Sequence, residues 1–238
     1  MKNVLIIDSG SGGVNILSKC VKRCPCNNYL LYIDDKNAPY GEKSNENLNK
    51  IATQILREVS SFFYPEIVVI GCNTLTSVTI SSLRQQFKDI FFIGAEPALN
   101  PALKSFDRES ILVLATQVTI KNSKVLRGFE DICFAPKDLP KIIDNNLFNR
   151  EEIVNYLKDF LPKNSYKAVV LGCTHFEGIK DEITKVFGSV NFFESGEGIA
   201  KRLSEICDKE ESYQIKIMTS GDGENLNLFY SYFLRLMS

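Results

Sequence analysis

The sequence lacks several features that would assign it to a particular class of protein. Its 238 residues include no tryptophan and a single histidine, and its formal net charge is −1. No apolar run approaches the roughly 18 residues that a membrane-spanning helix needs, and the apolar run at residues 4–7 is too short for a signal peptide. We therefore expect a cytoplasmic protein with no membrane segment and no broad electrostatic attraction for nucleic acid.

The cysteines also lack the pattern of a disulfide framework. There are seven of them, an odd number at irregular spacing. Without an export signal, free thiols are favoured. Cys20, Cys24 and Cys26 form a local cluster, but no second half accompanies them and the only histidine is far away in the sequence. We therefore expect no metal site there.

What the chain does contain is a pair of similar turns. Residues 67–74 read Ile-Val-Val-Ile-Gly-Cys-Asn-Thr, and residues 168–175 read Ala-Val-Val-Leu-Gly-Cys-Thr-His. In each, a short apolar run predicts a buried strand that ends at a glycine and is followed by a cysteine. The cysteines are Cys72 and Cys173, and His175 is the only histidine. Ligands bind beyond the carboxyl ends of strands in open α/β sheets, so both thiols are candidate site residues.

The order of predicted elements indicates an internal duplication. Each half of the chain has four strand signals that alternate with helices, and each half places its cysteine after the third strand. This alternation is typical of parallel sheets. We therefore predict an α/β protein of two pseudo-symmetric lobes, each a mostly parallel sheet flanked by helices. The active site would lie in the cleft between them, and the Pro-spaced stretch at residues 94–101 would cross from one lobe to the other.

Two thiols on opposite sides of one ligand suit racemisation, because one thiolate can remove a proton while the opposite thiol donates one. Each thiol needs help to ionise, and helix N-termini would provide it. Asp8 and His175 could relay protons to Cys72 and Cys173, although Asp8 could also simply cap the following helix. Polar side chains and backbone N–H groups would bind the substrate; the candidate residues are Ser9, Asn73, Thr74, Thr116, Thr119 and Thr174. No lysine has a recognisable pyridoxal phosphate context, so we expect no cofactor.

Taken together, these motifs resemble those of the aspartate/glutamate racemase superfamily, and most closely the glutamate racemases. The matching segments occur in the family's order over nearly the whole chain. They are Asp8-Ser9-Gly10, Gly12-Gly13, Pro39-Tyr40-Gly41, Lys43-Ser44, Cys72-Asn73-Thr74, Glu96-Pro97-Ala98, Pro101-Ala102, Ala115-Thr116, Thr119-Ile120, residues 171–175 and Thr219-Ser220-Gly221-Asp222.

The resemblance implies a substrate, a site and a division into lobes. It implies that glutamate is racemised without a cofactor, with Cys72 as the base for D-glutamate and Cys173 as the base for L-glutamate. It adds Asp8, Pro39, Tyr40, Gly41 and His175 to the substrate contacts. The first lobe would comprise residues 1–96 plus 208–238, and the second lobe residues 97–207. The resemblance also implies a role in supplying D-glutamate for peptidoglycan, and a possible homodimer.

Departures from the family pattern leave other functions open. Asn15 stands where Ser or Thr is common, and Phe-Glu-Gly follows His175 where Tyr-Pro is common. The family's acidic residue in the second lobe has only Asp144 as a rough match. The alternatives are a racemase for aspartate or another amino acid, a non-catalytic protein that binds a small ligand, and a Cys-His hydrolase or decarboxylase for which Cys72 would be dispensable.

Overall fold

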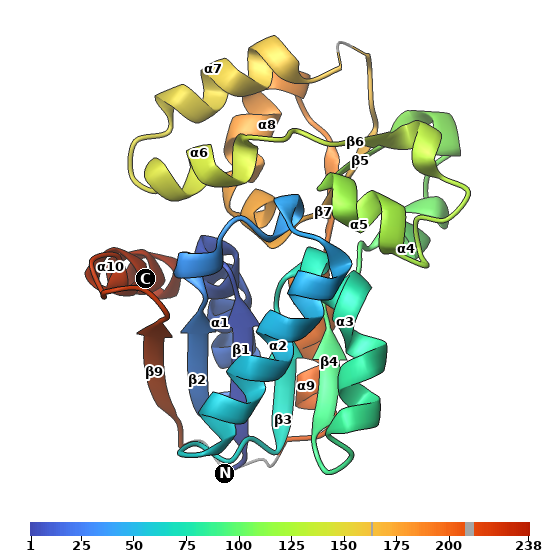
Figure 1. The fold of residues 1–238 in the computed structure, drawn as a ribbon. Helices are drawn as coiled ribbons and strands as arrows, with labels where there is room; N and C mark the ends of the chain where they lie inside the picture. The colour runs from blue at the N-terminus through green and yellow to red at the C-terminus, as the bar shows by residue number, and fades with distance from the viewer. Residues whose placement is uncertain (163, 208–211) are drawn as a thin grey trace.

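The computed structural model describes residues 1–162, 164–207 and 212–238, and it consists of two α/β lobes (Figure 1). The first sheet has the order β4-β3-β1-β2-β9 and is formed by β1 (Asn3–Asp8), β2 (Asn28–Ile33), β3 (Ile67–Ile70), β4 (Phe91–Gly94) and β9 (Gln214–Thr219). The second sheet has the order β6-β5-β7-β8 and is formed by β5 (Ile111–Ala115), β6 (Cys133–Phe134), β7 (Ala168–Gly172) and β8 (Asn191–Glu194). All described strand pairs are parallel.

The two sheets share one topology, as the predicted duplication requires. The first four strands have the spatial order β4-β3-β1-β2, and the next four have the equivalent order β8-β7-β5-β6. The predicted two-lobed parallel α/β fold is therefore confirmed. Strand β9 pairs with β2, so the C-terminal segment does return to the first sheet.

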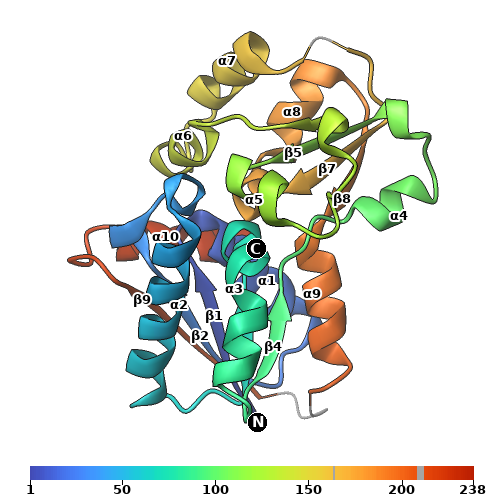
Figure 2. The same cartoon turned by 45° about the vertical axis from the view of Figure 1, so that its right-hand side comes forward.

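Helices cover both faces of each sheet, which explains why the strands are continuously apolar. Along β1, Val4 and Ile6 enter one core while Leu5 and Ile7 enter the other. Around the first sheet, α1 (Ser11–Arg23), α9 (Ser195–Ser204) and α10 (Leu226–Met237) lie on one side, and α2 (Asn45–Ser60) and α3 (Asn73–Gln86) lie on the other (Figures 1 and 2). Buried residues of α2 recur at helical spacing: Leu48, Ala52, Ile55, Leu56 and Val59.

The second lobe is built in the same way with shorter helices. On one side of its sheet are α4 (Leu99–Leu103) and α5 (Gln117–Asn122), and on the other are α6 (Leu139–Asn145), α7 (Glu151–Phe160) and α8 (Lys180–Phe187). Short 3₁₀ helices complete the connections: η1 (Asp35–Asn37), η2 (Tyr40–Glu42), η3 (Arg108–Ser110), η4 (Glu130–Ile132) and η5 (Thr174–Ile179). Across all the described ranges, none of the helices has the length and apolar character needed to span a bilayer.

The lobe boundary near the end of the second lobe differs from the prediction. Helix α9, assigned from the sequence to the second lobe, packs against α1 and β4 of the first lobe. Judged by these contacts, the chain returns to the first lobe at Ser195. The sequence predicts the return at residue 208, which lies outside the described residues. In the first lobe, helix α1 begins at Ser11, directly after the glycine at position 10. Its first turn includes Gly12 and Gly13, because a side chain there would collide with Thr174 or Asp8.

Candidate active site

A cleft of about 750 Å³ opens between the lobes, where the carboxyl ends of their central strands face each other. Strands β1 and β3 end there in the first lobe, and β5 and β7 end there in the second. Most of the predicted site residues line this cleft: Ser9, Pro39, Tyr40, Gly41, Cys72, Thr74, Thr116, Cys173 and His175. One cleft therefore receives a cysteine from each lobe.

Four other predicted contacts lie behind the wall of the cleft rather than on it: Asp8, Asn73, Thr119 and Thr174. Each is almost completely buried and has hydrogen-bond partners in the protein. Asn73, for example, donates from Nδ2 to Ser195 Oγ at 2.9 Å, and Ser195 Oγ donates in turn to the backbone oxygen of Glu96. In this structure these side chains support the residues that line the cleft.

Cys72 lies at the N-cap of the 14-residue helix α3 and is 5% exposed. Burial raises the pKa of its thiol well above the usual value, and the nearby negative charges of Asp8 and Cys173 raise it further. The backbone N–H groups of Leu75 and Thr74 lower the pKa, but do not offset the increase. The Cys72 thiol is therefore protonated at neutral pH.

Cys173 lies at the start of η5, is also 5% exposed, and has an imidazole beside it. Its Sγ is 3.7 Å from Nδ1 of His175, and Nε2 of His175 is 3.1 Å from Asp144 Oδ2. Burial opposes a charge on the imidazole, but Asp144 and the contact with Cys173 outweigh it and raise the pKa of His175 well above its usual value. This thiol therefore faces a protonated imidazole.

Asp144, only a rough match in sequence, holds a defined position. Besides its contact with His175, its Oδ1 accepts hydrogen bonds from the backbone N–H and the hydroxyl of Ser11 in the first lobe. A side chain at Gly10 would collide with both Asp144 and His175. The glycine in this motif is therefore required by the close approach of the two lobes.

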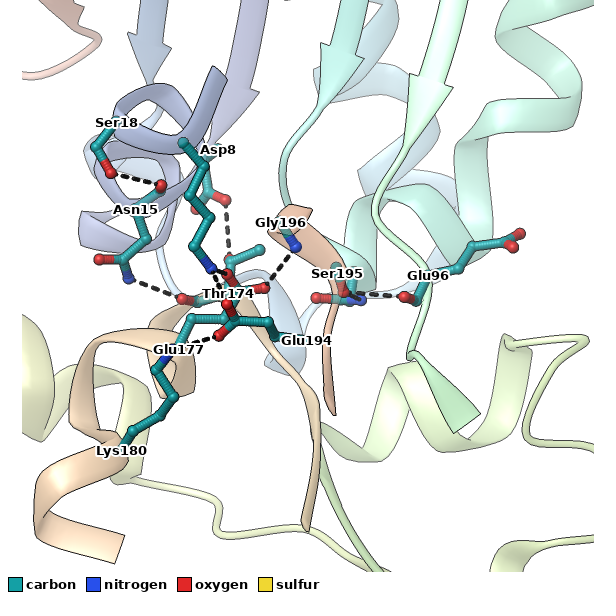
Figure 3. A network of polar contacts seen from close by, with 12 residues as sticks. Asp8, Asn15, Ser18, Glu96, Thr174, Glu177, Lys180, Glu194, Ser195 and Gly196 are labelled. Atoms are coloured by element: carbon teal, nitrogen blue, oxygen red, sulfur yellow. Dashed lines mark hydrogen bonds and ion pairs between the residues drawn. The ribbon is translucent and has the colours of Figure 1, made fainter. Parts of the chain in front are cut away.

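Asp8 connects the two halves of the site from behind (Figure 3). Its Oδ1 accepts from the backbone N–H groups of Ser9 and Gly10, and its Oδ2 accepts from the Thr174 hydroxyl at 3.0 Å. Burial raises the pKa of Asp8 despite these donors and the charge of His175. A side chain at Gly71 would come within 3.3 Å of Asp8 Oδ2, so the carboxyl lies close to the turn that carries Cys72.

Three threonine hydroxyls meet between the lobes on the other side of the cleft. Thr74 Oγ1 is 2.8 Å from Thr116 Oγ1 and 3.2 Å from Thr119 Oγ1. Thr116 also caps α5 by accepting from the Thr119 N–H. The loop through Pro39 and Gly41 closes over this region, and an added side chain at Gly41 would meet Thr116 at 3.2 Å.

The sequence did not reveal the charged residues at the rim of the cleft. Lys137 and Lys141, near the start of α6, and Asp35, in η1, all line it. Asp34, directly after β2, is buried behind the cleft and accepts a hydrogen bond from the Tyr40 hydroxyl at 2.7 Å. The position of Asp34 after a strand parallels that of Asp8, which is a signal that could have identified it. The two lysines stand in a segment without a recognisable motif.

Comparisons with known proteins point to one family. No family model matches the sequence. A glutamate racemase from Clostridium acetobutylicum is 34% identical over 90% of both chains, and glutamate racemase 2 from Bacillus subtilis is 36% identical over 84% of this chain and 79% of its own. The crystal structure of a glutamate racemase isoform from Bacillus anthracis is 23% identical with a TM-score of 0.85, covering 98% of this chain and 94% of that one, and supports the fold. An Escherichia coli glutamate racemase, described in complex with L-glutamate and an activator, is 25% identical with a TM-score of 0.77, covering 98% of this chain and 96% of its own.

Proposed function

The chain belongs to the glutamate racemase family, and from its site we propose that it interconverts L- and D-glutamate using Cys72 and Cys173 as opposed acid–base groups. The observation that supports this proposal is the position of the thiols. They follow equivalent strands of two equivalent lobes and line the same cleft. The two thiols supply both proton-transfer groups, so the mechanism needs no cofactor.

The protonation states of Cys72 and His175 suit the conversion of L-glutamate. Burial keeps Cys72 protonated, and the charged imidazole of His175 lies 3.7 Å from the sulfur of Cys173, which would act as the base. In the proposed step, Cys173 removes the α-proton and its S–H bond forms as the C–H bond breaks. The electron pair stays on the α-carbon until Cys72 donates its proton to the opposite face. D-glutamate, a Cys72 thiolate and a Cys173 thiol result, so protons and charge balance.

For D-glutamate, the site must first exchange its protons. We propose that Asp8 accepts the proton of Cys72, to which its raised pKa suits it, while His175 donates one to Cys173. Cys72 then acts as the base and Cys173 as the acid. Asp144 holds His175 from behind and stabilises its charged form.

The rest of the cleft would bind the charged groups of the substrate. We place an anionic carboxylate of glutamate near Thr74 and Thr116, whose hydroxyls lie by the N-terminus of α3, where the helix dipole favours negative charge. Lys137 and Lys141 are the cations at the rim and would attract a dicarboxylate. Asp8, Asn73, Thr119 and Thr174 would support these groups from behind.

The proposed activity also implies a cellular role. We propose that the D-glutamate supplies peptidoglycan synthesis and that the enzyme works in the cytoplasm, where a homodimer is possible. The named activity of the relatives supports the reaction in particular.

The test is incubation of the purified protein with L-glutamate in D₂O, followed by circular dichroism and by the proton NMR signal at the α-position. We expect loss of optical activity together with deuteration of the α-carbon. Cys72→Ser and Cys173→Ser should each abolish racemisation. Cys133→Ser is the matched control, because this thiol lies outside the cleft and contacts the Phe129 backbone oxygen.

Other outcomes would redirect the proposal. If aspartate loses its optical activity and glutamate does not, the two-thiol mechanism stands and the substrate is aspartate. Activity that survives in Cys72→Ser would favour a single nucleophilic thiol. If every acidic amino acid stays unchanged with the wild-type protein, the chain is a binding protein on the racemase scaffold.

A further inference from the structure

The turn that carries Cys173 is held from outside by a side chain of the first lobe (Figure 3). Asn15, on α1, donates from Nδ2 to the backbone oxygen of Thr174 at 2.9 Å. Thr174 is the single residue between Cys173 and His175, so this hydrogen bond fixes the peptide that joins the thiol to its imidazole. Asn15 is only 4% exposed, and its bond to Thr174 is buried.

A second side chain holds the other end of the Asn15 amide. The hydroxyl of Tyr232, on α10, donates to Asn15 Oδ1 at 2.9 Å. Because the backbone oxygen of Thr174 can only accept, Nδ2 of Asn15 is directed at Thr174 and Oδ1 is directed at the Tyr232 hydroxyl. Tyr232 is 2% exposed and packs edge-on against Phe148. The C-terminal helix of the chain is thereby connected to the catalytic turn of the other lobe.

Two glycines make this arrangement possible. An added side chain at Gly178 would lie 2.6 Å from the Tyr232 hydroxyl and 3.2 Å from Asn15 Nδ2. An added side chain at Gly12 would lie 2.2 Å from Thr174 Oγ1.

Cys72 lacks an equivalent bond: in the part of the chain that the structure describes, no side chain donates to the backbone oxygen of Asn73. The Cys72 turn opens a helix of 14 residues, and the backbone oxygen of Cys72 accepts the first helical hydrogen bond, from Thr76 N–H at 2.9 Å. The Cys173 turn opens only the six-residue 3₁₀ helix η5, in which hydrogen-bond geometry is poorer. The short helix leaves the position of Cys173 more dependent on contacts from outside.

We propose that Asn15 and Tyr232 are positioning residues that hold the Cys173–His175 pair at its working geometry. The proposal deepens the proposed racemase function and rests on it for the kinetic part of its test. Neither residue touches the substrate, because neither lines the cleft. A small displacement of a reacting group is sufficient to cost about a hundredfold in rate, so the orientation of one peptide has a measurable effect.

The experiment compares Asn15→Asp, Tyr232→Phe and the control Tyr230→Phe. Asn15→Asp keeps the acceptor for Tyr232 but loses the donor to Thr174, and Tyr232→Phe removes a single hydroxyl. Tyr230 is on the same helix, but its hydroxyl accepts from Ile217 N–H, away from the site. We expect kcat/KM to fall at least tenfold in Asn15→Asp and several-fold in Tyr232→Phe, with no change in Tyr230→Phe.

A second measurement separates positioning from a general loss of structure. Iodoacetamide labelling, read for each cysteine by mass spectrometry across pH, should change for Cys173 in both variants and stay unchanged for Cys72. A merely structural role would lower the melting temperature and leave the ratio of the two labelling rates as in the wild type. If the ratio of the Cys173 and Cys72 labelling rates is the same in Asn15→Asp as in the wild type, the proposal is overturned. If the wild-type protein does not racemise glutamate, the proposed function fails, while the labelling ratio still decides whether the two residues position Cys173.

Discussion

Cys72 and Cys173 follow the third strand of their respective lobes, but the surroundings of the two thiols differ. Cys72 has the N-terminus of a long helix and a buried carboxyl near it. Cys173 has a short 3₁₀ helix, a charged imidazole 3.7 Å away, and Asp144 behind that imidazole. Duplication has preserved the strand order and the position of the thiol, while the groups that control ionisation have diverged.

The difference shows which parts of the site are local and which depend on both lobes. The Cys72 turn opens a long helix, and it meets the second lobe through the hydroxyl of Thr74, which contacts Thr116 and Thr119. The Cys173 turn is held by residues of the first lobe, through Asn15, Ser11 by way of Asp144, and Lys19 by way of Glu177. Changes in the contact between lobes should therefore affect Cys173 first. The following predictions test this asymmetry.

Removal of the imidazole should have the largest effect. We expect His175→Asn to lower kcat by about 10²- to 10⁴-fold, the usual contribution of a general acid–base group. Because the two enantiomers have equal free energies in solution, kcat/KM must fall by the same factor in both directions. The asymmetry should be visible in iodoacetamide labelling at neutral pH, which should slow at Cys173 and stay constant at Cys72. Equal slowing at both thiols would contradict an assignment of His175 to Cys173.

Loss of the Lys19 side chain should weaken the support of the turn that carries Cys173. Lys19, one helical turn after Asn15, is 2.6 Å from Glu177 and 2.5 Å from Glu194. Burial opposes its charge, but the two carboxylates outweigh burial and raise the pKa of Lys19. Breaking a buried ion pair costs about 3–5 kcal/mol of unfolding free energy. We expect the loss in Lys19→Met to lie at the low end of this range because the Lys19 side chain is partly exposed.

Chemical denaturation measures this effect on the free energy of unfolding. The matched control is Lys50→Met, which breaks an exposed pair with Glu46 on α2 and should cost only about 0.3–0.5 kcal/mol. In Lys19→Met, labelling of Cys173 should change more than labelling of Cys72. Equal losses of stability in the two lysine variants would show that the Lys19 cluster does not hold the turn.

Removal of the carboxylate behind His175 should produce a pH-dependent effect on stability. The pKa of His175 is raised in the folded protein, so its contribution is complete below its unfolded pKa of about 6.5 and is lost as pH rises through the folded pKa. We expect Asp144→Asn to lower the free energy of unfolding by about 1.5–3 kcal/mol at pH 6, the worth of a hydrogen bond to a charged group. The difference from wild type should shrink as the pH is raised. A difference that stays constant from pH 6 upward would mean that His175 is not the titrating group.

Much of the fold and the position of the cleft could be predicted from the sequence, because these depend on local signals. Apolar runs ended by Gly-Cys identified β3 and β7, and their repetition predicted the shared topology. Contacts between distant segments have no such signal. The pairing of Asp144 with His175 and the packing of α9 on α1 bring together residues far apart in the chain. The same is true of Asn15 and Tyr232, which are 217 residues apart in the chain.

The smallest expected effect is that of Asp8→Asn on the labelling of the two thiols. This variant distinguishes Cys72 from Cys173 most clearly. The charge of Asp8 raises the pKa of Cys72, so Asp8→Asn should lower it and shift the labelling profile of Cys72 to lower pH. A shift of one unit would increase Cys72 labelling about tenfold at a pH below the pKa. Labelling of Cys173, measured in the same sample, is the internal control.

The same substitution should reduce turnover, because Asp8 is the proposed acceptor of the Cys72 proton. Asp8→Asn would then make Cys72 more reactive toward iodoacetamide while the enzyme becomes slower. His175→Asn should instead lower both the reactivity of Cys173 and the turnover. If labelling of Cys72 rises while turnover falls in Asp8→Asn, the carboxyl restrains Cys72. If labelling of Cys173 and turnover both fall in His175→Asn, the imidazole activates Cys173. If Asp8→Asn left Cys72 labelling unchanged, the carboxyl would serve only to hold the Ser9–Gly10 backbone and the Thr174 hydroxyl.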